Sequence, residues 1–585
     1  MNHGAHRLSQ CGAVGFLLFA GVIFSLSVQA DALSGAMLPG SLPLAESNRV
    51  YIAEIEHRGL TLTRKAFPGI ASALRSNDTA RLATFFSPSF RGETLATDQG
   101  IGPAGDVLNI HRSTSTVESK QKPVATDAPG FARYLTGLRT PFVADAKVNL
   151  ALMSLSPQQR EKLDGGWVGS LELRIIGHLT AGGTAELVEK MEFEFTTVPD
   201  VDVVLTEPGW IRSLRVIEAQ EAAATHDLMV EVARERGIDR ALFQDNWTMP
   251  PSRRAIVTGG IYLADIDNDG RQDFLVTDMK GLFLFRGLEG GRFEEVTAKA
   301  GLPQNLRAVM SAVFGDFDND GLVDLILPGR VFRNTGNFHF EDITSRVPFQ
   351  FGNVSGFTVG DYDKDGRLDL YVTRMNTGQI ERTARNSWID GPGGPGNQLW
   401  RNLGGWKFED VSATAHAAAG HRSVFTAAWL DANNDGWPDI YVINEFGGGV
   451  LLVNNGNGTF REQTLLDDAG DFGSMGMAVA DFNNDGNIDI YTANMYSKAG
   501  RRIMENLPEG SYPPATFAKM KRFVTGSELY RNLGGLKFER VGKSMRAHAV
   551  GWAYGATFLD LDNDGFLDLY GTAGFMSVNK EEPDG

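Results

Sequence analysis

The chain of 585 residues is too long for a single hydrophobic core, so we expect two to four domains. Hydrophobic residues make up 42% and charged residues 22% of the sequence, a globular composition that excludes wholesale disorder and a polytopic membrane protein. The formal net charge is −17, and no basic stripe offsets it. Nucleic acid and anionic lipid are therefore excluded as expected partners, because phosphate binders concentrate Lys and Arg.

Residues 1–30 have the features of a secretory signal peptide. Arg7 supplies a positive start, residues 12–28 form an almost unbroken apolar run, and Val28-Gln29-Ala30 is typical of a cleavage site. The alternative is an N-terminal membrane anchor, but the run is at the lower limit of the ~17–25 residues that span a bilayer. We therefore predict a secreted, periplasmic or cell-surface protein without a membrane span after cleavage. Because Cys11 is the only cysteine, the mature chain would lack disulfides, zinc-cysteine sites and cysteine nucleophiles.

Residues 31–47 are expected to be a flexible N-terminus, followed by an α+β domain over residues 48–237. The pattern from about 48 to 90 is helical. Asn77-Asp78 is expected to end one helix and to cap a second, which begins near Thr79.

A sheet is expected to follow these helices. Residues 95–130 are rich in Gly, Pro, Ser and Thr and are typical of a loop. Four β-prone stretches come next, with a hairpin turn at residues 181–184 between the second and the third: 146–154, 167–179, 184–197 and 209–217. A helix over 218–236, ending at Gly237, is expected to close the domain. This order of elements resembles the cone-shaped nuclear-transport-factor-like fold, and without a catalytic pair of side chains such a domain is expected to dock or to dimerise.

Six copies of one acidic loop dominate the rest of the chain. Each copy reads Asp-x-(Asp/Asn)-x-Asp-Gly-x-x-Asp between two β-prone stretches, and the copies begin at Asp265, Asp316, Asp361, Asp431, Asp481 and Asp560. Side chains at positions 1, 3 and 5 converge, Gly at position 6 permits the reversal, the carbonyl at 7 points inward and the carboxylate at 9 completes the shell. One copy could equally be a plain β-turn, but six copies favour a metal site. Hard oxygen donors favour Ca²⁺, because softer metals prefer His or Cys.

We therefore expect about six structural Ca²⁺ sites, with ligands at positions 1, 3, 5, 7 (through the backbone) and 9 of each loop. The predicted ligands are Asp265, Asp267, Asp269, Arg271, Asp273, Asp316, Asp318, Asp320, Leu322, Asp324, Asp361, Asp363, Asp365, Arg367, Asp369, Asp431, Asn433, Asp435, Trp437, Asp439, Asp481, Asn483, Asp485, Asn487, Asp489, Asp560, Asp562, Asp564, Phe566 and Asp568.

A second motif recurs between the loops: a short strand, an Asn/Gly turn and a strand that carries Phe, as in residues 399–412. The repeat therefore has four strands, and four-stranded antiparallel units of about 45 to 51 residues predict a β-propeller. The expected fold is mainly β: a propeller of six or seven four-stranded blades over residues 255–585, preceded by the α+β domain. The last blade is incomplete, so either residues 238–254 form a closing strand rather than a linker, or the chain is truncated.

These repeats resemble FG-GAP/VCBS repeats, as in the integrin α-subunit propeller, and the whole chain resembles the cartilage acidic protein (ASPIC/UnbV-like) family. The resemblance implies an exported, calcium-binding propeller that binds a protein or a glycan in adhesion or scaffolding. The alternative is an extracellular polysaccharide lyase or hydrolase, with its site on the face opposite the calcium loops. A third option is a surface scaffold that assembles through the α+β domain.

Two long insertions, residues 373–398 and 493–528, are expected to project from the face opposite the calcium loops, where binding usually resides. They concentrate basic residues in an acidic protein. We expect an anionic glycan or a carboxylated peptide to bind there; the alternative is a solvated loop whose charges balance neighbouring acids. The candidate ligand-binding residues are Arg501, Arg502, Arg382 and Arg385. No phosphate-binding loop, zinc-protease motif or nucleophile elbow is present in the sequence, so no catalytic residue is assigned.

Overall fold

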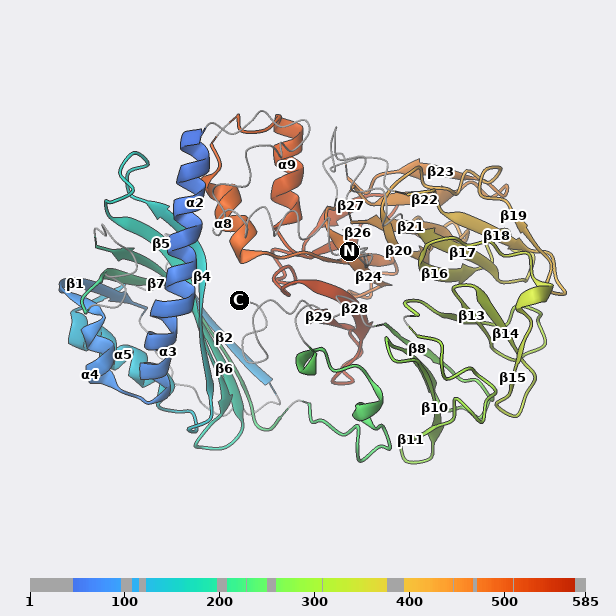
Figure 1. Ribbon diagram of the computed structural model, residues 1–585, viewed down its shortest axis with the longest axis horizontal. Coiled ribbons are helices and arrows are strands. Elements are labelled where there is room, and N and C mark those ends of the chain that lie inside the picture. Colours follow the sequence, from blue (N-terminus) through green and yellow to red (C-terminus); the bar gives the residue numbers. More distant parts are fainter. Residues whose placement is uncertain are drawn as a thin grey trace, which may run out of the picture.

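The structure is a computed structural model. It describes residues 46–95, 108–114, 123–196, 208–227, 229–249, 259–307, 309–375, 394–445, 447–466, 471–508 and 510–573. The predicted signal peptide and nearly all of the predicted flexible N-terminus lie outside these residues. Figure 1 shows an α+β region at one end of the molecule and a set of small sheets at the other. In the part of the chain that is described, no helix combines the length and the hydrophobicity that crossing a bilayer requires.

The N-terminal region begins with helices, as predicted. They are α2 (Glu46–Thr61), the π-helical turn η1 (Leu62–Ala66), α3 (Phe67–Arg75) and α4 (Thr79–Thr84). The predicted break is confirmed: Asn77 has a φ of 56°, and the Asp78 carboxylate accepts a hydrogen bond from the N–H of Arg81. One helix was not predicted. This is α5 (Ala128–Arg139), capped by Asp127, whose first residues fall in the stretch expected to be a loop.

A seven-stranded sheet packs against these helices (Figure 1). Its strands are β1 (Phe86–Thr94), β2 (Leu108–Thr114), β3 (Val124–Thr126), β4 (Lys147–Pro157), β5 (Trp167–His178), β6 (Thr184–Phe195) and β7 (Ile211–Ala224). The order is β3-β1-β7-β6-β5-β4, and β2 also pairs with β7. The four predicted strands are β4 to β7, and β5 and β6 form the predicted hairpin, with φ of 96° at Gly182 and 81° at Gly183. Aromatic and aliphatic side chains from both layers form one continuous apolar core.

The helix expected over residues 218–236 is wrong. Its first part continues β7 to Ala224, residues 229–232 are irregular, and residues 233–237 form a turn. The segment Glu218–Ala224 has high helix propensity, but it pairs with β6 on one side and with β2 on the other. Hydrogen bonds to two neighbouring strands outweigh the few tenths of a kcal/mol per residue that propensity contributes.

The remaining described chain forms six consecutive antiparallel sheets, here called sheets 1 to 6, each in the predicted order of strand, acidic loop and further strands. Sheet 1 contains β8 (Ile261–Ala264), β9 (Asp273–Thr277), β10 (Leu282–Leu288) and β11 (Arg292–Glu295). Sheet 2 contains β12 (Val313–Gly315), β13 (Asp324–Leu327), β14 (Arg330–Asn334) and β15 (Phe340–Asp342). Sheet 3 contains β16 (Val354–Gly360), β17 (Asp369–Arg374), β18 (Gln398–Asn402) and β19 (Phe408–Asp410).

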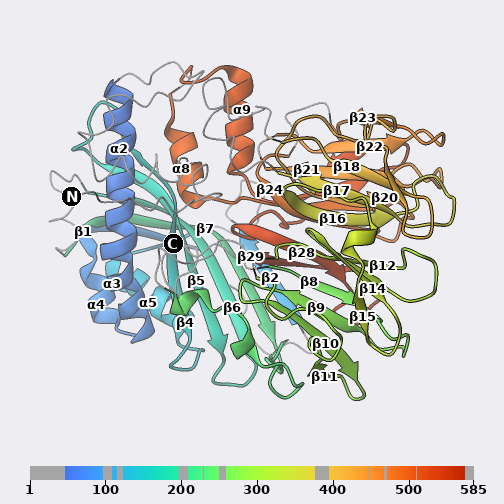
Figure 2. The same cartoon turned by 45° about the vertical axis from the view of Figure 1, so that its right-hand side comes forward.

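Sheet 4 contains β20 (Val424–Leu430), β21 (Asp439–Asn444), β22 (Val450–Asn454) and β23 (Phe460–Gln463). Sheet 5 contains β24 (Ser474–Ala480), β25 (Asp489–Asn494), β26 (Glu528–Asn532) and β27 (Phe538–Arg540). Sheet 6 has two strands in the described chain, β28 (Ala553–Leu559) and β29 (Asp568–Ala573). The first strand of each sheet contacts the first strand of the next, so the sheets follow one another through this part of the molecule (Figure 2). Small apolar clusters fill the spaces between neighbouring sheets.

The described residues of the segment between the two regions, 238–249, form no strand. They include the short 3₁₀ turns η2 (Arg240–Leu242) and η3 (Asn246–Thr248). Phe243 packs edge-on against Phe283 of sheet 1, with ring centroids 5.5 Å apart. The segment therefore covers part of sheet 1, and its described residues pair with neither strand of sheet 6.

Candidate metal centre

Each acidic loop is shaped by its own carboxylates. In sheet 2 the Asp316 carboxylate accepts hydrogen bonds from the backbone N–H groups of Asp320 (3.1 Å) and Gly321 (2.8 Å). Asp320 in turn accepts one from the N–H of Leu322 at position 7, at 3.0 Å. Gly321 has a φ of 86°, a conformation that residues with a side chain rarely adopt. The same pattern of bonds recurs in all six loops, so positions 1, 5 and 6 set the turn.

The structure brings positions 1, 3 and 5 together in four loops. In each of these loops the three carboxylates place one oxygen each within 4.8 Å of one another, and the groups are Asp265, Asp267 and Asp269; Asp316, Asp318 and Asp320; Asp361, Asp363 and Asp365; and Asp560, Asp562 and Asp564. In the fourth and fifth loops position 3 is an asparagine. The Asn433 amide donates to Asp435 at 2.8 Å, and the Asn483 amide donates to Asp485 at 3.0 Å.

The first three loops each leave one carboxylate oxygen at position 3 buried without a hydrogen-bond donor. These atoms are Oδ1 of Asp267, Asp318 and Asp363. A buried polar atom without a partner costs about 1–3 kcal/mol, and more when the group is charged. Three neighbouring carboxylates with such an atom suit a hard divalent cation, which takes oxygen ligands. The residues present therefore fit a metal ion.

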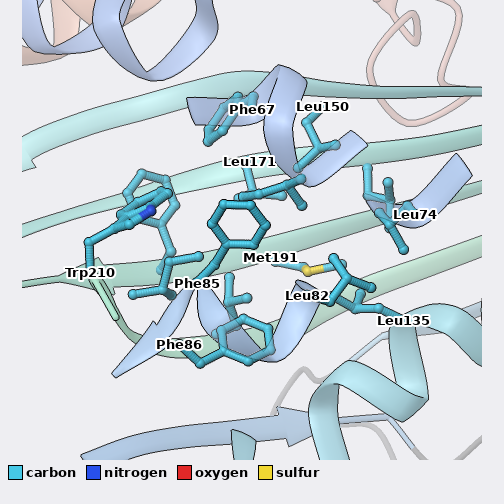
Figure 3. A pocket seen from close by; sticks show the side chains of 15 residues that line it. Phe67, Leu74, Leu82, Phe85, Phe86, Leu135, Leu150, Leu171, Met191 and Trp210 are labelled. Atoms are coloured by element: carbon cyan, nitrogen blue, oxygen red, sulfur yellow. The ribbon is translucent and has the colours of Figure 1, made fainter. Parts of the chain in front are cut away.

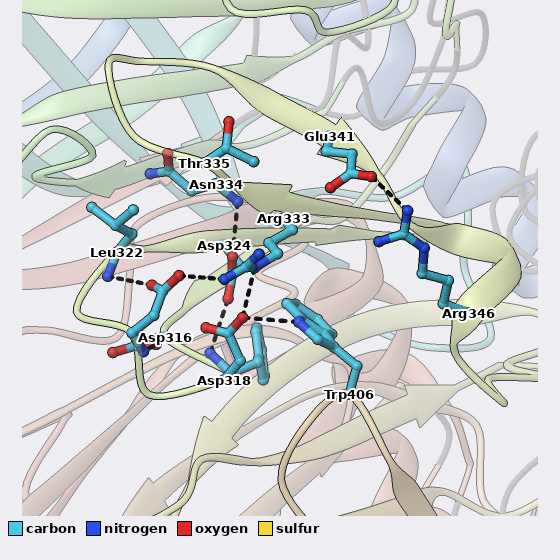
Figure 4. Close-up of polar contacts among 12 residues, drawn as sticks. Asp316, Asp318, Leu322, Asp324, Arg333, Asn334, Thr335, Glu341, Arg346 and Trp406 are labelled. Carbon is cyan, nitrogen blue, oxygen red and sulfur yellow. Dashed lines mark hydrogen bonds and ion pairs between the residues drawn. The ribbon is translucent and has the colours of Figure 1, made fainter.

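An arginine on the third strand of the sheet faces the carboxylates at positions 3 and 5. In sheet 2, Nε of Arg333 lies 2.7 Å from Oδ2 of Asp318, and Nη2 lies 2.7 Å from Oδ2 of Asp320 (Figure 4). Arg286 and Arg401 make the equivalent ion pairs in sheets 1 and 3. The hydrogen bond to Asp318 raises the pKa of Arg333 further above its usual range. Each arginine neutralises part of the negative charge of its loop.

This arginine accompanies an aspartate at position 3. Where Asn433 takes that position, the third strand carries Val453. Where Asn483 takes it, Arg531 pairs with Glu539 of the neighbouring strand at 2.6 Å. Among the first five loops, the three with an aspartate at position 3 therefore pair it with an arginine of the third strand, and the fourth and fifth do not. Sequence reasoning missed these arginines, although the recurrent Arg-Asn pair in the third strand was a signal.

The aspartate at position 9 lies apart from the triplets. Asp324 is fully buried, and its carboxylate accepts the N–H of Phe317 (3.0 Å) and the N–H of Asn334 (2.9 Å). Asp273, Asp369, Asp439 and Asp489 accept the equivalent pairs of N–H groups. The structure therefore shows this carboxylate joining its own loop to the third strand.

Burial raises the pKa of these position-9 carboxyl groups, and the backbone hydrogen bonds oppose the rise. The pKa of Asp324 and of Asp369 is raised to about 7, and that of Asp439 and of Asp489 to about 6. The neighbouring aspartates of the same loop add to the rise by repulsion. A cation in the loop would counter this repulsion, since it would favour the ionised form.

In sheets 2 to 5 a buried asparagine on the third strand links the loop to the loop of the preceding sheet. Nδ2 of Asn402 donates to the carbonyl of Phe317 in the second loop (2.8 Å) and to that of Leu368 in its own loop (3.1 Å). Asn334, Asn454 and Asn532 make the equivalent pairs of bonds. All four asparagines are at most 2% exposed. The acidic loops therefore belong to a polar network that runs between sheets.

A second link joins neighbouring loops at their surface, through position 4. Asn268 donates to the carbonyl of Gly321 at 2.8 Å, and Asn319, Asn434 and Asn484 make the equivalent bond to the next loop. The third loop has Lys364 instead, and its ammonium lies 4.4 Å from the centre of the Trp437 ring of the fourth loop. The six loops therefore form one continuous row. The recurrent Asp-Asn-Asp-Gly sequence was a signal that sequence reasoning did not use.

The described part of the basic second insertion is folded, and one of its predicted ligand-binding residues is buried. It folds into α8 (Lys498–Asn506) and α9 (Pro514–Phe523), and α8 lies beside α2 (Figures 1 and 2). Arg502 is 6% exposed, and its guanidinium donates to both Glu56 oxygens at 3.1 Å. Its assignment as a ligand-binding residue is therefore corrected, since its partner is a residue of the N-terminal region. Arg501, 38% exposed, lies 3.6 Å from Glu505. Arg382 and Arg385 lie outside the described residues.

Asn506 completes this contact between the two regions. Its Nδ2 donates to the carbonyl of Leu155 at 2.9 Å. Its Oδ1 accepts from Tyr51 Oη (3.1 Å) and Ser156 Oγ (2.9 Å). Ile503 of the same helix joins the apolar core of the N-terminal region. The insertion therefore fastens the repeats to the α+β region.

A cavity lies inside the N-terminal region, between the helices and the sheet (Figure 3). Its lining is apolar, with Phe67, Leu82, Met191 and Trp210 among the contributing side chains. Nε1 of Trp210 is buried there without a hydrogen-bond partner in the described structure. The lining contains no group that titrates or acts as a nucleophile, so this cavity offers no acid–base chemistry.

Comparisons with known proteins identify the type of repeat in this chain. A model of the FG-GAP-like repeat matches residues 265–327, 328–372 and 431–492, which contain the first five acidic loops. The chain therefore carries FG-GAP-like repeats. The finer resemblance, to cartilage acidic protein and to integrin α-subunits, stays a prediction. The comparison with curated proteins found no match.

Three solved structures illustrate the range of similar proteins. A lectin of Agrocybe aegerita that recognises non-reducing terminal N-acetylglucosamine is 16% identical, with 63% of this chain and 78% of that chain covered and a TM-score of 0.31. A variant of Rd1NTF2_05 is 15% identical, with 27% and 96% covered and a TM-score of 0.16. The biofilm matrix protein Bap1 of V. cholerae is 14% identical, with 43% and 38% covered and a TM-score of 0.24. These scores are too low to support an argument about fold or function.

Proposed function

We propose that this protein is an exported, calcium-stabilised β-propeller that binds a protein or glycan partner as an adhesion or scaffold module. The observation that carries the proposal is the buried, unpartnered oxygen at position 3 of the first three acidic loops. It lies among carboxylates whose oxygens converge within 4.8 Å. The FG-GAP-like repeats support the binding role, because β-rich repeats of this kind are binding modules.

The arrangement of the sheets supports a ring. Five sheets share the same four-stranded order, and consecutive sheets meet through their first strands. The position-4 links place the acidic loops in one row along the same edge of the array. Repetition of this step around an axis produces a propeller with its cation loops on one face. The proposed binding surface is the face opposite the cation loops.

Calcium fits better than other ions for a chemical reason. The loops offer carboxylate and amide oxygens and no His or Cys, and Ca²⁺ accepts six to eight oxygens in flexible geometry, whereas Mg²⁺ demands a near-ideal octahedron. Extracellular calcium modules bind at about 10⁻⁴–10⁻³ M, which agrees with the export that the signal-like N-terminus predicts. The proposed role of calcium is structural: it neutralises each triplet and holds the first turn of each sheet.

Calorimetric titration and thermal unfolding test this role. We expect Ca²⁺ to bind at several sites, and removal of Ca²⁺ with EGTA to lower the melting temperature by about 10 °C or more, since several bound ions each stabilise by roughly 1 kcal/mol. Asp318→Asn should weaken one site, whereas Glu341→Gln, a carboxylate of the same sheet that pairs with Arg346 outside the loop, should leave the titration unchanged. A melting temperature that is indifferent to EGTA would contradict the proposal.

The binding role needs a separate test. The calcium-loaded protein, applied to an array of acidic and neutral glycans and to extracellular matrix proteins, should bind at least one of them saturably. EGTA should abolish that binding, because it loosens the sheets that support the opposite face. Failure to bind any of these surfaces would leave the calcium result standing and would count against the adhesion role.

A further inference from the structure

The first strands of sheets 3 to 6 share an irregularity near their starts, at the ends away from the acidic loops. In each of these sheets the pairing with the second strand shifts by one residue, so that one residue of the first strand is bulged: Ser355 in β16, Phe425 in β20, Met475 in β24 and Tyr554 in β28. A β-bulge turns a side chain out of the regular alternation, and bulges are common beside binding sites. The repeat therefore redirects one side chain per sheet at the same level.

Two of the redirected side chains meet although their sheets are not neighbours. The Phe425 ring of sheet 4 lies 6.4 Å, between ring centroids, from the Tyr554 ring of sheet 6. β24 of sheet 5 lies between β20 and β28 and contacts both. Gly476, directly after the bulge of β24, has no room for a Cβ atom, because the carbonyl oxygen of Tyr554 occupies that space. Both rings are half-buried, so they form an aromatic surface that solvent reaches.

A buried apolar cluster holds these rings in place. The two rings and the half-buried Trp552 pack against this cluster, which includes Met475 and Phe523. The Trp552 indole N–H donates to Sδ of Met475 at 3.3 Å. Phe523 is the last residue of α9, so the second insertion contributes to the cluster. Side chains fixed in this way lose little conformational freedom when a ligand binds.

A carboxyl group without a partner lies beside the rings. Glu445 directly follows β21; its N–H donates to the carbonyl of Ser423, and its carbonyl accepts from the N–H of Gly473, both at 3.0 Å. Glu445 is half-buried, and in the described structure its carboxyl group has no hydrogen bond or ion pair. Burial therefore raises the pKa of Glu445 to about 7. Burial also raises the pKa of Tyr554, and the charge of Glu445 raises it further, an interaction that requires the two groups to be neighbours.

Two buried serine hydroxyl groups next to Glu445 also lack partners. Ser423 lies opposite Glu445 across the strand pair, and Ser474 follows the residue that donates to the Glu445 carbonyl. The two serines are 2% and 0% exposed, and neither Oγ has a hydrogen-bond partner in the described structure. Buried polar atoms are costly to leave unpaired. The site therefore combines aromatic rings with oxygen atoms that can accept hydrogen bonds.

We propose that Phe425, Tyr554 and Glu445, with the two serines, bind the ammonium group of a lysine side chain on a partner protein. An ammonium group is attracted to the faces of aromatic rings, pairs with a carboxylate and carries three N–H donors for the carboxylate and serine oxygens. The formal net charge of −17 also attracts a basic partner. The inference rests on the proposed function, because the site lies at the strand ends opposite the acidic loops, and it narrows the partner to a protein with an exposed lysine.

A small lysine derivative tests the inference. The calcium-loaded full-length protein is titrated with N-acetyl-lysine methylamide, and binding is followed by ligand-observed NMR. We expect saturable binding with a Kd of about 1 mM. The norleucine derivative lacks the ammonium group and the trimethyl-lysine derivative lacks its N–H donors, so each should bind at least about tenfold weaker. Equal binding of either derivative would overturn the proposal.

Variants of the protein locate the site. Glu445→Gln should weaken binding of the lysine derivative by about tenfold or more, and Tyr554→Leu by about threefold. Glu462→Gln, which changes a carboxylate of the same sheet that pairs with Arg422, should leave the Kd within about twofold.

A readout in the unmodified protein does not depend on the folding of a variant. Nuclear Overhauser effects should appear between the lysine ε-methylene protons and aromatic ring protons of the protein. Absence of these effects, or equal binding by Glu445→Gln and the unmodified protein, would overturn the proposal. Such a failure would leave calcium binding and binding to glycans or matrix proteins standing, because neither is measured with this ligand.

Discussion

The N-terminal region and the repeats are both built on antiparallel sheets, but different forces hold them together. In the N-terminal region a single apolar core joins α2 to α5 with one long sheet, and Ile55, Phe131 and Trp167 are completely buried in it. In the repeats the apolar clusters between sheets are smaller, and a buried network of Asp and Asn side chains joins the acidic loops. One region relies on packing, the other on packing and on charge compensation.

The difference shows why the two regions should respond to different conditions. Apolar burial changes little with ions, whereas carboxylates that converge without a cation repel one another and are costly to bury. We expect the repeats to depend on divalent ions, and the N-terminal region to depend on the protonation of its few buried acids. The contact through α8 should make each region sensitive to the other.

The largest effect should be the response to chelation. Hydrogen exchange of the full-length protein, measured with Ca²⁺ and with EGTA, should show protection lost at the first and second strands of sheets 1 to 5, by about 100-fold or more if the opening free energy falls by about 3 kcal/mol. The N-terminal sheet, β4 to β7, should keep its protection. Equal loss in both regions would contradict the comparison.

The next effect concerns the contact between the regions. Arg502→Met leaves Glu56 buried without its partner, and removal of one member of a buried pair costs about 3–5 kcal/mol. Arg501→Met is the matched control, since its neighbouring guanidinium is more exposed and its loss should cost less than about 1 kcal/mol. Denaturant unfolding followed by tryptophan fluorescence compares the two variants. Similar losses for both would show that the Arg502–Glu56 pair does not join the regions.

A smaller effect is expected from the polar network of the repeats. Asn402→Ala leaves the carbonyls of Phe317 and Leu368 without their donor and should cost about 2–4 kcal/mol. Asn455→Ala, an exposed asparagine of sheet 4, should change the free energy of unfolding by less than about 0.5 kcal/mol. The midpoint of denaturant unfolding, measured in Ca²⁺, distinguishes them. A neutral Asn402→Ala would mean that the buried asparagines do not link the sheets.

The smallest effect is the pH dependence of the N-terminal region. Burial raises the pKa of Glu189 to about 7, and the hydrogen bond from Tyr134 opposes the rise. Because the folded pKa lies above the unfolded one, the folded form binds the extra proton, and stability is lost as pH rises from about 4.5 through 7. Glu189→Gln should remove this slope and stabilise the region at pH 8 by about 2 kcal/mol, since the shift is worth about 3 kcal/mol and the buried amide costs about 1. An unchanged slope between pH 5 and 8 would contradict this assignment.

The sequence predicts what local patterns determine. The repeat order of strand, acidic loop and strand follows from each copy, and the break at Asn77-Asp78 follows from capping chemistry. Local patterns failed where residues distant in the sequence determine the secondary structure. β7 continues through a helix-forming stretch because β2 and β6 pair with it. The first turn of α5 lies in a stretch whose Gly and Pro content predicted a loop. Arg502 seemed free for a ligand because its partner, Glu56, lies 446 residues away in the chain.

The candidate metal site likewise has a part that the sequence predicts and a part that it does not. Convergence of positions 1, 3 and 5 could be predicted from spacing alone, and the structure confirms it where all three are aspartates. One backbone amide that engages position 9 belongs to position 2 of the same loop, whereas the other amide and the arginine that faces position 3 come from the third strand. These third-strand partners could not be predicted within a nine-residue loop, since they depend on how the sheet pairs.

The row of acidic loops has a consequence for how ions would load. Each position-4 asparagine donates a hydrogen bond to the backbone of the next loop. An ion that orders one loop would therefore favour the bound conformation of its neighbour, so that binding would be cooperative between adjacent loops. The surface links differ at one junction: between the third and fourth loops Lys364 lies on the Trp437 ring, and the buried Asn454 amide joins the two loops through the carbonyls of Tyr362 and Pro438. We therefore expect weaker coupling at this junction, and Lys364→Asn should make the calcium dependence steeper.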